Sequence, residues 1–459
     1  VRGRTGTPVV IDVTGLTKLQ PSYKNIWGIS FPIIIAGISE TVVEVTDTIL
    51  LAHYGMTELA AVGIAASIYG VALFLTLGLV DGIQIFVARR AGEGHNRQIG
   101  EVFNQGIYML GLAAIAMILL VVLVLPLVTA NLLASEAIHI KMNAYLRISA
   151  HALLFQSFNL AYSAFFVGIS RTRVLIAATA ILAITNVVLD YALIFGNLGF
   201  AEYGIEGAAV ASLSAEIAAF AFLTGIIFWR GYHRTFNMLH FTRWKPELCK
   251  KLVDISTPVS LEALVGSLKW LLFFVMIEQL GEQPLGKASI IFSCYAVLLI
   301  PIDSFSESAC SMASNLIGQK RQHDLALLIR RVIVLNYAVT LPVLVLSLVF
   351  PENIMAIFTT DEVLVAKSIG SLAVIALAIL VAVPAEVLFS TIVGTGDTRA
   401  ILNIQVATTT LTLVCVYVAA FIMSLELHFI WMAEVFGWLT CLLLSGWWFK
   451  SGRWNRQVF

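Results

Sequence analysis

Three polar residues inside otherwise apolar stretches are the first candidates for chemistry: Asp47, Asn186 and Asp190. Asn186 and Asp190 are four residues apart, a spacing that puts both side chains on one face of a helix. An ionised carboxylate inside a bilayer costs at least about 2.5 kcal/mol, so such residues face a bundle interior or a water-filled cavity. These positions are therefore typical of an ion pathway.

Glu40, Glu44 and Asp47 follow one another at spacings of four and three, which aligns three carboxyls along one stripe of a helix. Because carboxylates held together in a low dielectric cannot all ionise, we expect at least one to keep a proton near neutral pH. Carboxylate, amide and hydroxyl oxygens also suit a hard cation such as Na⁺, which gives a possible Na⁺ site at Asp47, Asn186 and Asp190. The residues do not decide whether the bound ion is H⁺ or Na⁺, and no other cofactor is expected.

The second half of the chain carries four further ionisable residues in apolar stretches: Glu262, Lys269, Asp303 and Glu386. We expect Lys269 to neutralise Glu262 or Asp303. The group predicts either a second ion site or a substrate site in the C-terminal half, and the sequence does not choose between them.

The elements that position these residues are long apolar segments. Hydrophobic residues make up 59% of the 459 residues and charged ones 12%, about half of what a soluble domain carries. Since about 20 apolar residues cross a bilayer, the pattern predicts an all-α integral membrane protein with twelve transmembrane helices. The expected spans are 25–52, 59–88, 104–131, 141–169, 173–196, 205–229, 252–279, 285–314, 326–350, 365–394, 400–424 and 428–449.

Basic residues alternate between the two sides of this map. The expected outer segments contain only Lys141, Lys287 and Lys367, whereas the inner segments contain all the arginine clusters, including those of 230–251. This asymmetry predicts that both termini are cytoplasmic. The expected organisation is an N-terminal segment 1–24, an N-lobe 25–229, a linker 230–251, a C-lobe 252–449 and a tail 450–459.

The two halves repeat each other at a single fixed offset, the one that leads from Pro32 to Pro258. Parallel repeats of six helices are a transporter layout that works by alternating access. The acidic residues break the repeat. Asp47, Asn186 and Asp190 fall opposite Phe273, Thr412 and Val416, and Asp303 falls opposite Leu77. Residues present in only one copy are candidates for function rather than scaffold.

The chain resembles the multidrug and toxic compound extrusion (MATE) family of cation-coupled exporters over nearly its whole length. The motifs that carry the resemblance are ETVVEVTDTILLAHYG (40–55), IQIFVARRAGEG (83–94), NVVLDYALIFG (186–196), GIEGAAVASLSAE (204–216), ASNLIGQ (313–319) and VGTGDTRA (393–400). The resemblance implies two six-helix lobes, no enzymatic activity, and export of lipophilic cations, neutral amphiphiles or one natural product.

The resemblance also implies roles for single residues. Asp47, Asn186 and Asp190 match the N-lobe cation site of the DinF-like and related branches, and Ser212 stands where a threonine is usual. Members of the NorM-like branch carry an acidic residue at the position of Gly266, so this chain departs from that branch there. The implied mechanism is competition between ion and substrate for mutually exclusive states. A monomer in a bacterial cytoplasmic membrane is expected.

Two other functions compete with this interpretation. A lipid-linked-precursor flippase of the wider superfamily would line its cavity with basic residues, whereas the only basic residues well away from the ends of the spans here are Arg147 and Lys269. A non-transporting receptor would share the membrane fold. No HExxH, P-loop or GxSxG motif predicts enzymatic chemistry, and the zero net charge offers no support for a nucleic-acid partner.

Overall fold

Helices form every regular element that the computed structural model describes, which covers residues 18–129, 135–240, 242–355, 362–452 and 454. Within these residues, ten helical segments are long and apolar enough to cross a membrane. Two shorter apolar helical stretches, Met56–Gly70 at the start of a longer helix and Ala152–Gly168, lie where the second and fourth spans are predicted. The predicted all-α membrane fold is confirmed. Most of the predicted terminal segments 1–24 and 450–459, and the side chain of Lys367, lie outside the described residues.

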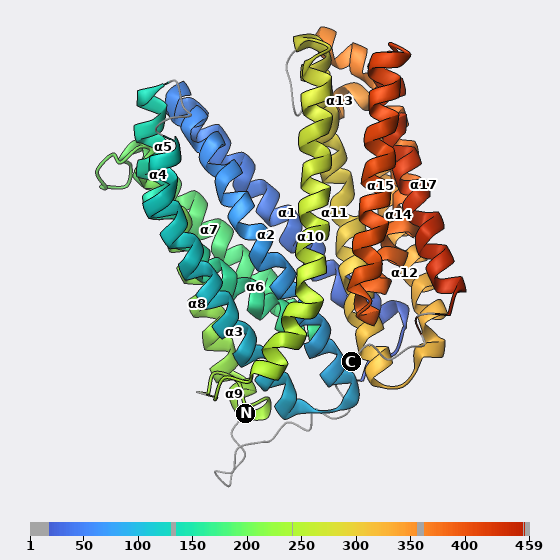
Figure 1. Cartoon of the computed structure of the whole chain (residues 1–459). Coiled ribbons are helices and arrows are strands. Elements are labelled where there is room, and N and C mark those ends of the chain that lie inside the picture. The colour runs from blue at the N-terminus through green and yellow to red at the C-terminus, as the bar shows by residue number, and fades with distance from the viewer. Residues whose placement is uncertain (1–17, 130–134, 241, 356–361, 453, 455–459) are drawn as a thin grey trace. The chain divides into compact units, whose positions relative to one another are not determined.

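The first compact unit, unit 1, contains residues 35–256. Within it α8 packs against α5, α6 and α7, and α2 packs against α3, α5 and α6 (Figure 1). Its elements are α1 (Tyr23–Tyr54, from residue 35 on), α2 (Met56–Glu93), α3 (Asn96–Leu119), the π-helical η1 (Leu120–Val124), α4 (Leu125–Thr129), α5 (Glu136–Ser149), α6 (Ala152–Gly168), α7 (Arg173–Phe195), α8 (Ile205–Trp229), α9 (Tyr232–Thr235) and the start of α10 (Pro246–Glu278).

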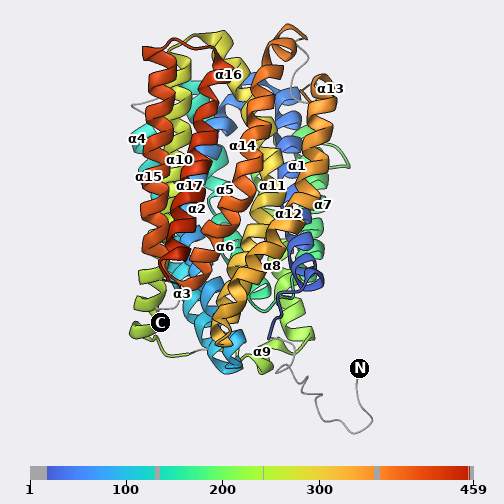
Figure 2. The same cartoon turned by 90° about the vertical axis from the view of Figure 1, so that its right-hand side faces the viewer.

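The second compact unit, unit 2, contains residues 19–34 and 257–459. Its central helix is α14, which packs against α11, α12 and α17 (Figure 2). Besides the parts of α1 and α10, its elements are α11 (Glu282–Gly318), the 3-10 turn η2 (Gln322–Asp324), α12 (Leu325–Val349), α13 (Pro351–Met355), α14 (Glu362–Thr395), α15 (Thr398–Tyr417), the π-helical η3 (Val418–Ile422), α16 (Leu427–Ile430) and α17 (Met432–Lys450).

The first turns of α1 are part of unit 2. Ile26 and Ile29 are buried in one hydrophobic cluster with Phe305 of α11, and Ser30 Oγ donates a hydrogen bond to Ser308 Oγ at 2.8 Å. Apolar burial of this kind contributes about 25 cal/mol per Å², so the start of α1 is held by the core of unit 2. The expected ranges 25–229 and 252–449 follow the sequence repeat. The compact units follow the contacts between residues, and their borders therefore fall inside α1 and α10.

The first turns of α10 make the equivalent contact in unit 1. Ser256 lies so close to Gly82 of α2 that a Cβ on this glycine would be 2.2 Å from Ser256 Oγ. In the alignment of the two repeats, Ser256 falls opposite Ser30 and Gly82 falls opposite Ser308. The start of α1 thus contacts α11 at the position that corresponds, in the other repeat, to the contact of α10 with α2.

Glycines set the closest helix approaches, again at equivalent positions. A Cβ on Gly168 of α6 would be 2.6 Å from Val87 Cγ1 of α2, and one on Gly394 of α14 would be 2.3 Å from the Cys310 carbonyl oxygen of α11. Small residues at such points let helix backbones come together in a membrane. The repeat thus preserves packing as well as sequence.

We expect Gly394→Ala to lower the free energy of unfolding by about 1–3 kcal/mol, because the added methyl group meets backbone that has to move. Gly446→Ala is the matched control, since a Cβ on that helical glycine of α17 meets no atom within 4 Å. Detergent unfolding curves of both variants would measure the difference. Equal stability of the two variants would contradict the close packing of α14 on α11.

Candidate functional site

The carboxyl groups of Asp47 in α1 and Asp190 in α7 lie within hydrogen-bonding reach of each other in unit 1. Asp190 is completely buried and Asn186, one turn earlier on α7, is 1% exposed. No ion pair within the described residues involves either aspartate. Two ionised carboxylates repel each other and cannot hydrogen-bond, so a proton or a cation bound between them would stabilise this contact.

Helix α8 supplies the next polar group of the site. Asn186 Nδ2 donates to Ser212 Oγ at 3.5 Å. The two helices approach closely because Gly207 has no side chain: a Cβ there would be 2.7 Å from the backbone carbon of Leu193 in α7. Four of the six residues predicted for the N-terminal ion site, Asp47, Asn186, Asp190 and Ser212, are thus brought together.

Tyr145 of α5 completes this cluster and was not among the predicted site residues. Its hydroxyl is within hydrogen-bonding reach of Ser212, and it interacts electrostatically with both Asp47 and Asp190. The signal that identified the aspartates was available here too, because the residue opposite Tyr145 in the second repeat is Ser371. Below, "the α1–α7 site" means Asp47, Tyr145, Asn186, Asp190 and Ser212.

Several buried oxygens of the α1–α7 site have no hydrogen-bond partner among the described residues. They are Asp47 Oδ1, Asn186 Oδ1 and both carboxyl oxygens of Asp190. Buried acceptors without a donor are costly, about 1–3 kcal/mol each, so native structures satisfy nearly all of them. A group of such acceptors in one cluster is what a small cation or a proton would bind.

Glu40 and Glu44 continue from this cluster along α1, because Glu44 interacts electrostatically with Asp47, and Glu40 with Glu44. Both are exposed, and the electrostatic neighbour of Glu40 on α8 is Glu216, which accepts a hydrogen bond from Asn159 Nδ2 at 2.7 Å. The structure therefore places the upstream end of the predicted carboxyl stripe beside a second polar group, formed by α6 and α8. Glu216 and Asn159 were not among the predicted site residues.

Unit 2 has a different polar group. Lys269 Nζ of α10 binds both carboxyl oxygens of Glu434 in α17 at 3.0 Å, and it lies 4.2 Å from the ring centre of Trp270. The ion-pair partner that the structure gives Lys269 is thus Glu434, which was not among the predicted residues. A buried ammonium takes a partner that can be desolvated with it, and Glu434, only 4% exposed in its side chain, meets that condition.

The remaining predicted residues of unit 2 lie near this pair. Glu386 of α14 accepts a hydrogen bond from Ser390 Oγ at 3.0 Å and interacts electrostatically with Asp303 of α11. Glu262, Lys269 and Glu386 are all electrostatic neighbours of one side chain, Cys441. The structure thus brings the four predicted residues of the C-terminal half into one region of unit 2.

The α1–α7 site has no counterpart among the described residues of unit 2. Phe273 and Val416, the residues opposite Asp47 and Asp190, are buried members of a hydrophobic cluster. Thr412, opposite Asn186, is 2% exposed. The asymmetry seen in the sequence is therefore an asymmetry of environment, with a polar site in one repeat and an apolar core in the other.

Comparisons with known proteins agree with the repeat. The MatE family model matches residues 32–192 and again residues 258–418, which is the same offset that relates Pro32 to Pro258. A probable multidrug resistance protein NorM of Thermotoga maritima is 23% identical over 441 residues, which is 95% of this chain and 94% of that protein.

Two solved structures share the fold. A MOP superfamily transporter from Pyrococcus furiosus superposes with a TM-score of 0.88 at 19% identity, covering 97% of this chain and 99% of that one. An outward-facing multidrug resistance MATE family transporter of the MOP superfamily gives a TM-score of 0.87 at 19% identity, with the same coverage. At this identity the likeness concerns the fold alone.

Proposed function

Because this chain belongs to the MatE family, whose members are transporters rather than enzymes, we propose that it is a cation-coupled exporter of small molecules. It is a multi-pass membrane protein. In the proposal it takes up H⁺ or Na⁺ and expels a lipophilic cation or neutral amphiphile. One observation carries the proposal: the facing carboxyls of Asp47 and Asp190 exist in one repeat only.

The coupling needs only that ion and substrate favour different states of the protein. When the α1–α7 site binds an ion, its facing oxygens are satisfied and α1 is drawn to α7. When the ion leaves, the two carboxylates repel each other. A substrate that binds the ion-free state is then released when the ion returns, and alternating access of the two repeats gives the exchange its direction.

A proton is the ion that the α1–α7 site favours. One proton would convert two facing carboxylates into a donor and an acceptor, and the carboxyls of Asp47 and Asp190 are close enough to share it. Na⁺ is the second candidate, and the unpartnered Asn186 Oδ1 is the observation in its favour, since an amide oxygen binds a metal ion but not a proton at neutral pH.

Two finer points of the proposal concern cargo and location. The one lysine midway along a span, Lys269, is already bound to Glu434, which disfavours a pyrophosphate cargo and hence a lipid-linked-precursor flippase. The basic residues of 230–251 favour a cytoplasmic location for this segment and for both termini. We place the protein, as a monomer, in a bacterial cytoplasmic membrane.

Ethidium efflux from everted membrane vesicles tests this proposal directly. A proton gradient and a Na⁺ gradient are imposed separately, and vesicles without the protein set the background. Efflux driven by one gradient identifies the coupling ion. Absence of efflux under both gradients, with a range of cationic and neutral dyes, would contradict the proposed drug export.

We expect Tyr145→Phe to lower the efflux rate by about two- to tenfold, because a single hydrogen bond is worth about 0.5–1.5 kcal/mol. The variant removes only the hydroxyl that reaches Ser212. Tyr191→Phe is the matched control, since Tyr191 lies on α7 with 51% of its surface exposed. An equal loss in both variants would exclude a specific role for Tyr145 in the α1–α7 site.

A further inference from the structure

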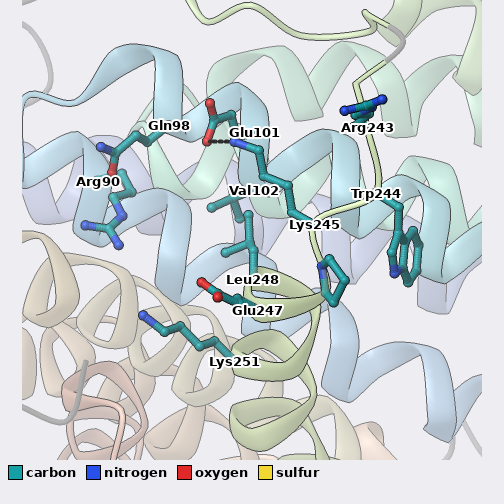
Figure 3. Close-up of a pocket in the computed structure, with 11 residues that line it drawn as sticks. Arg90, Gln98, Glu101, Val102, Arg243, Trp244, Lys245, Glu247, Leu248 and Lys251 are labelled. Carbon is teal, nitrogen blue, oxygen red and sulfur yellow. Dashed lines mark ion pairs between the residues drawn. The ribbon is translucent and has the colours of Figure 1, made fainter.

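A cavity of about 700 Å³ opens in unit 1, and none of the α1–α7 site residues lines it. The end of α2, the start of α3 and the start of α10 form its walls, together with the segment that precedes α10 (Figure 3). It contains none of the residues used in the proposed transport cycle. Its principal side chains are Arg90, Glu101, Arg243, Trp244, Lys245 and Lys251.

The lining of this cavity is positively charged. Arg90 is neutralised by Glu93 at 2.6 Å, and Lys245 by Glu101 at 2.8 Å, the pair that Figure 3 marks with a dashed line. Arg243 is in neither pair.

Arg243 and Lys251 are both exposed, and no ion pair within the described part of the chain involves either of them. Only Glu247 remains to offset them among the acidic lining residues. The cavity therefore presents an excess of positive charge, and a guanidinium and an ammonium are the two side-chain groups that bind phosphate best.

The spans expected from the sequence put this cavity at the level of the lipid headgroups. Lys251 directly precedes the span expected from residue 252, and Arg90 follows the span expected to end at residue 88. Trp244 is 48% exposed, as is usual for tryptophans at a membrane–water interface. Basic pockets at the cytoplasmic ends of transmembrane helices bind anionic headgroups.

We propose that this cavity binds the phosphate headgroup of an anionic phospholipid. Arg243 and Lys251 donate hydrogen bonds to the phosphate oxygens, and Trp244 packs at the boundary between headgroup and acyl chain. The first turns of α10 belong to unit 1 by their contacts, and the bound lipid helps to hold them there. A soluble phosphate compound shares the headgroup chemistry but gains nothing from an interfacial tryptophan, so we commit to the lipid.

Native mass spectrometry of the purified full-length protein, titrated with phosphatidylglycerol or phosphatidylcholine, tests this proposal. One Lys or Arg near anionic lipid is worth about fivefold in affinity, so Arg243→Gln/Lys251→Gln is expected to weaken phosphatidylglycerol binding about 25-fold. Arg243→Lys/Lys251→Arg, which keeps both charges, should bind nearly as the wild type does.

Arg171→Gln/Lys320→Gln is the control, because both residues are exposed, lie on the expected cytoplasmic side and are absent from the cavity. An equal loss of lipid in this control would reduce the effect to general surface charge and overturn the proposal. Equal binding of phosphatidylcholine and phosphatidylglycerol would overturn it too. Displacement of phosphatidylglycerol by millimolar inorganic phosphate would also overturn it and identify the cavity as a site for soluble anions.

Discussion

Asp190→Asn is expected to abolish gradient-driven efflux while the protein still folds and inserts. Asparagine fills the same space, but it cannot carry the ion that the two carboxyls hold between them. Coupling free energies of about 1–3 kcal/mol change the affinity for one ligand by about 5- to 150-fold when the other binds. Because Asp190 is completely buried, we expect its replacement to remove this coupling, and gradient-driven efflux with it. The measurement is the initial rate of ethidium efflux at matched expression.

Asp47→Asn should give the same result, and the double variant should be no worse than either single one, because residues that act as one unit are not additive. Asp254→Asn is the matched control: the same change on an exposed aspartate of α10. Full efflux in Asp190→Asn would move the coupling site to Asp303 or Glu386 in unit 2. Independent, additive losses from Asp47 and Asp190 would contradict a shared ion.

The second large effect is on stability. Glu434→Gln is expected to lower the free energy of unfolding by about 3–5 kcal/mol, because it removes the carboxylate that binds the buried ammonium of Lys269. The two side chains are only 14% and 4% exposed. Unfolding in mixed micelles of increasing denaturing detergent, followed by circular dichroism, would measure the loss.

Two controls separate this effect from a general loss of charge. Glu101→Gln breaks the Lys245–Glu101 pair, whose side chains are 46% and 36% exposed, and should cost at most about 1 kcal/mol. Lys269→Met/Glu434→Leu removes both charges and should recover most of the stability, since apolar residues often replace a buried pair without loss. A double variant as unstable as Glu434→Gln would contradict the ion-pair explanation.

The sequence predicted the helices well because each one must satisfy its own backbone in lipid. Length and hydropathy then suffice, and the single ungapped offset between the halves defined the repeat. The cluster of Asp47, Asn186 and Asp190 was also predictable. The spacing of four fixes one face of α7, and the comparison of repeats singles out residues that the scaffold does not need.

What the sequence could not predict depends on packing between distant helices. The partner of Lys269 is 165 residues away on α17, and no spacing rule connects them. Tyr145 was passed over because an isolated tyrosine in an apolar helix is more often a core residue than a ligand. The borders of the compact units fall inside α1 and α10, where hydropathy has no signal because both sides of each border are equally apolar.

The most direct test of the central claim is to count the ions that leave the α1–α7 site when substrate binds. Purified wild-type protein and Asp190→Asn are titrated with ethidium by calorimetry, in buffers of different ionisation enthalpy and at several Na⁺ concentrations. We predict that the wild type releases a proton on binding, or binds more weakly as Na⁺ rises, and that Asp190→Asn binds ethidium with neither effect. Proton release or Na⁺ competition that persists unchanged in Asp190→Asn would contradict the assignment of the coupling site to Asp47 and Asp190.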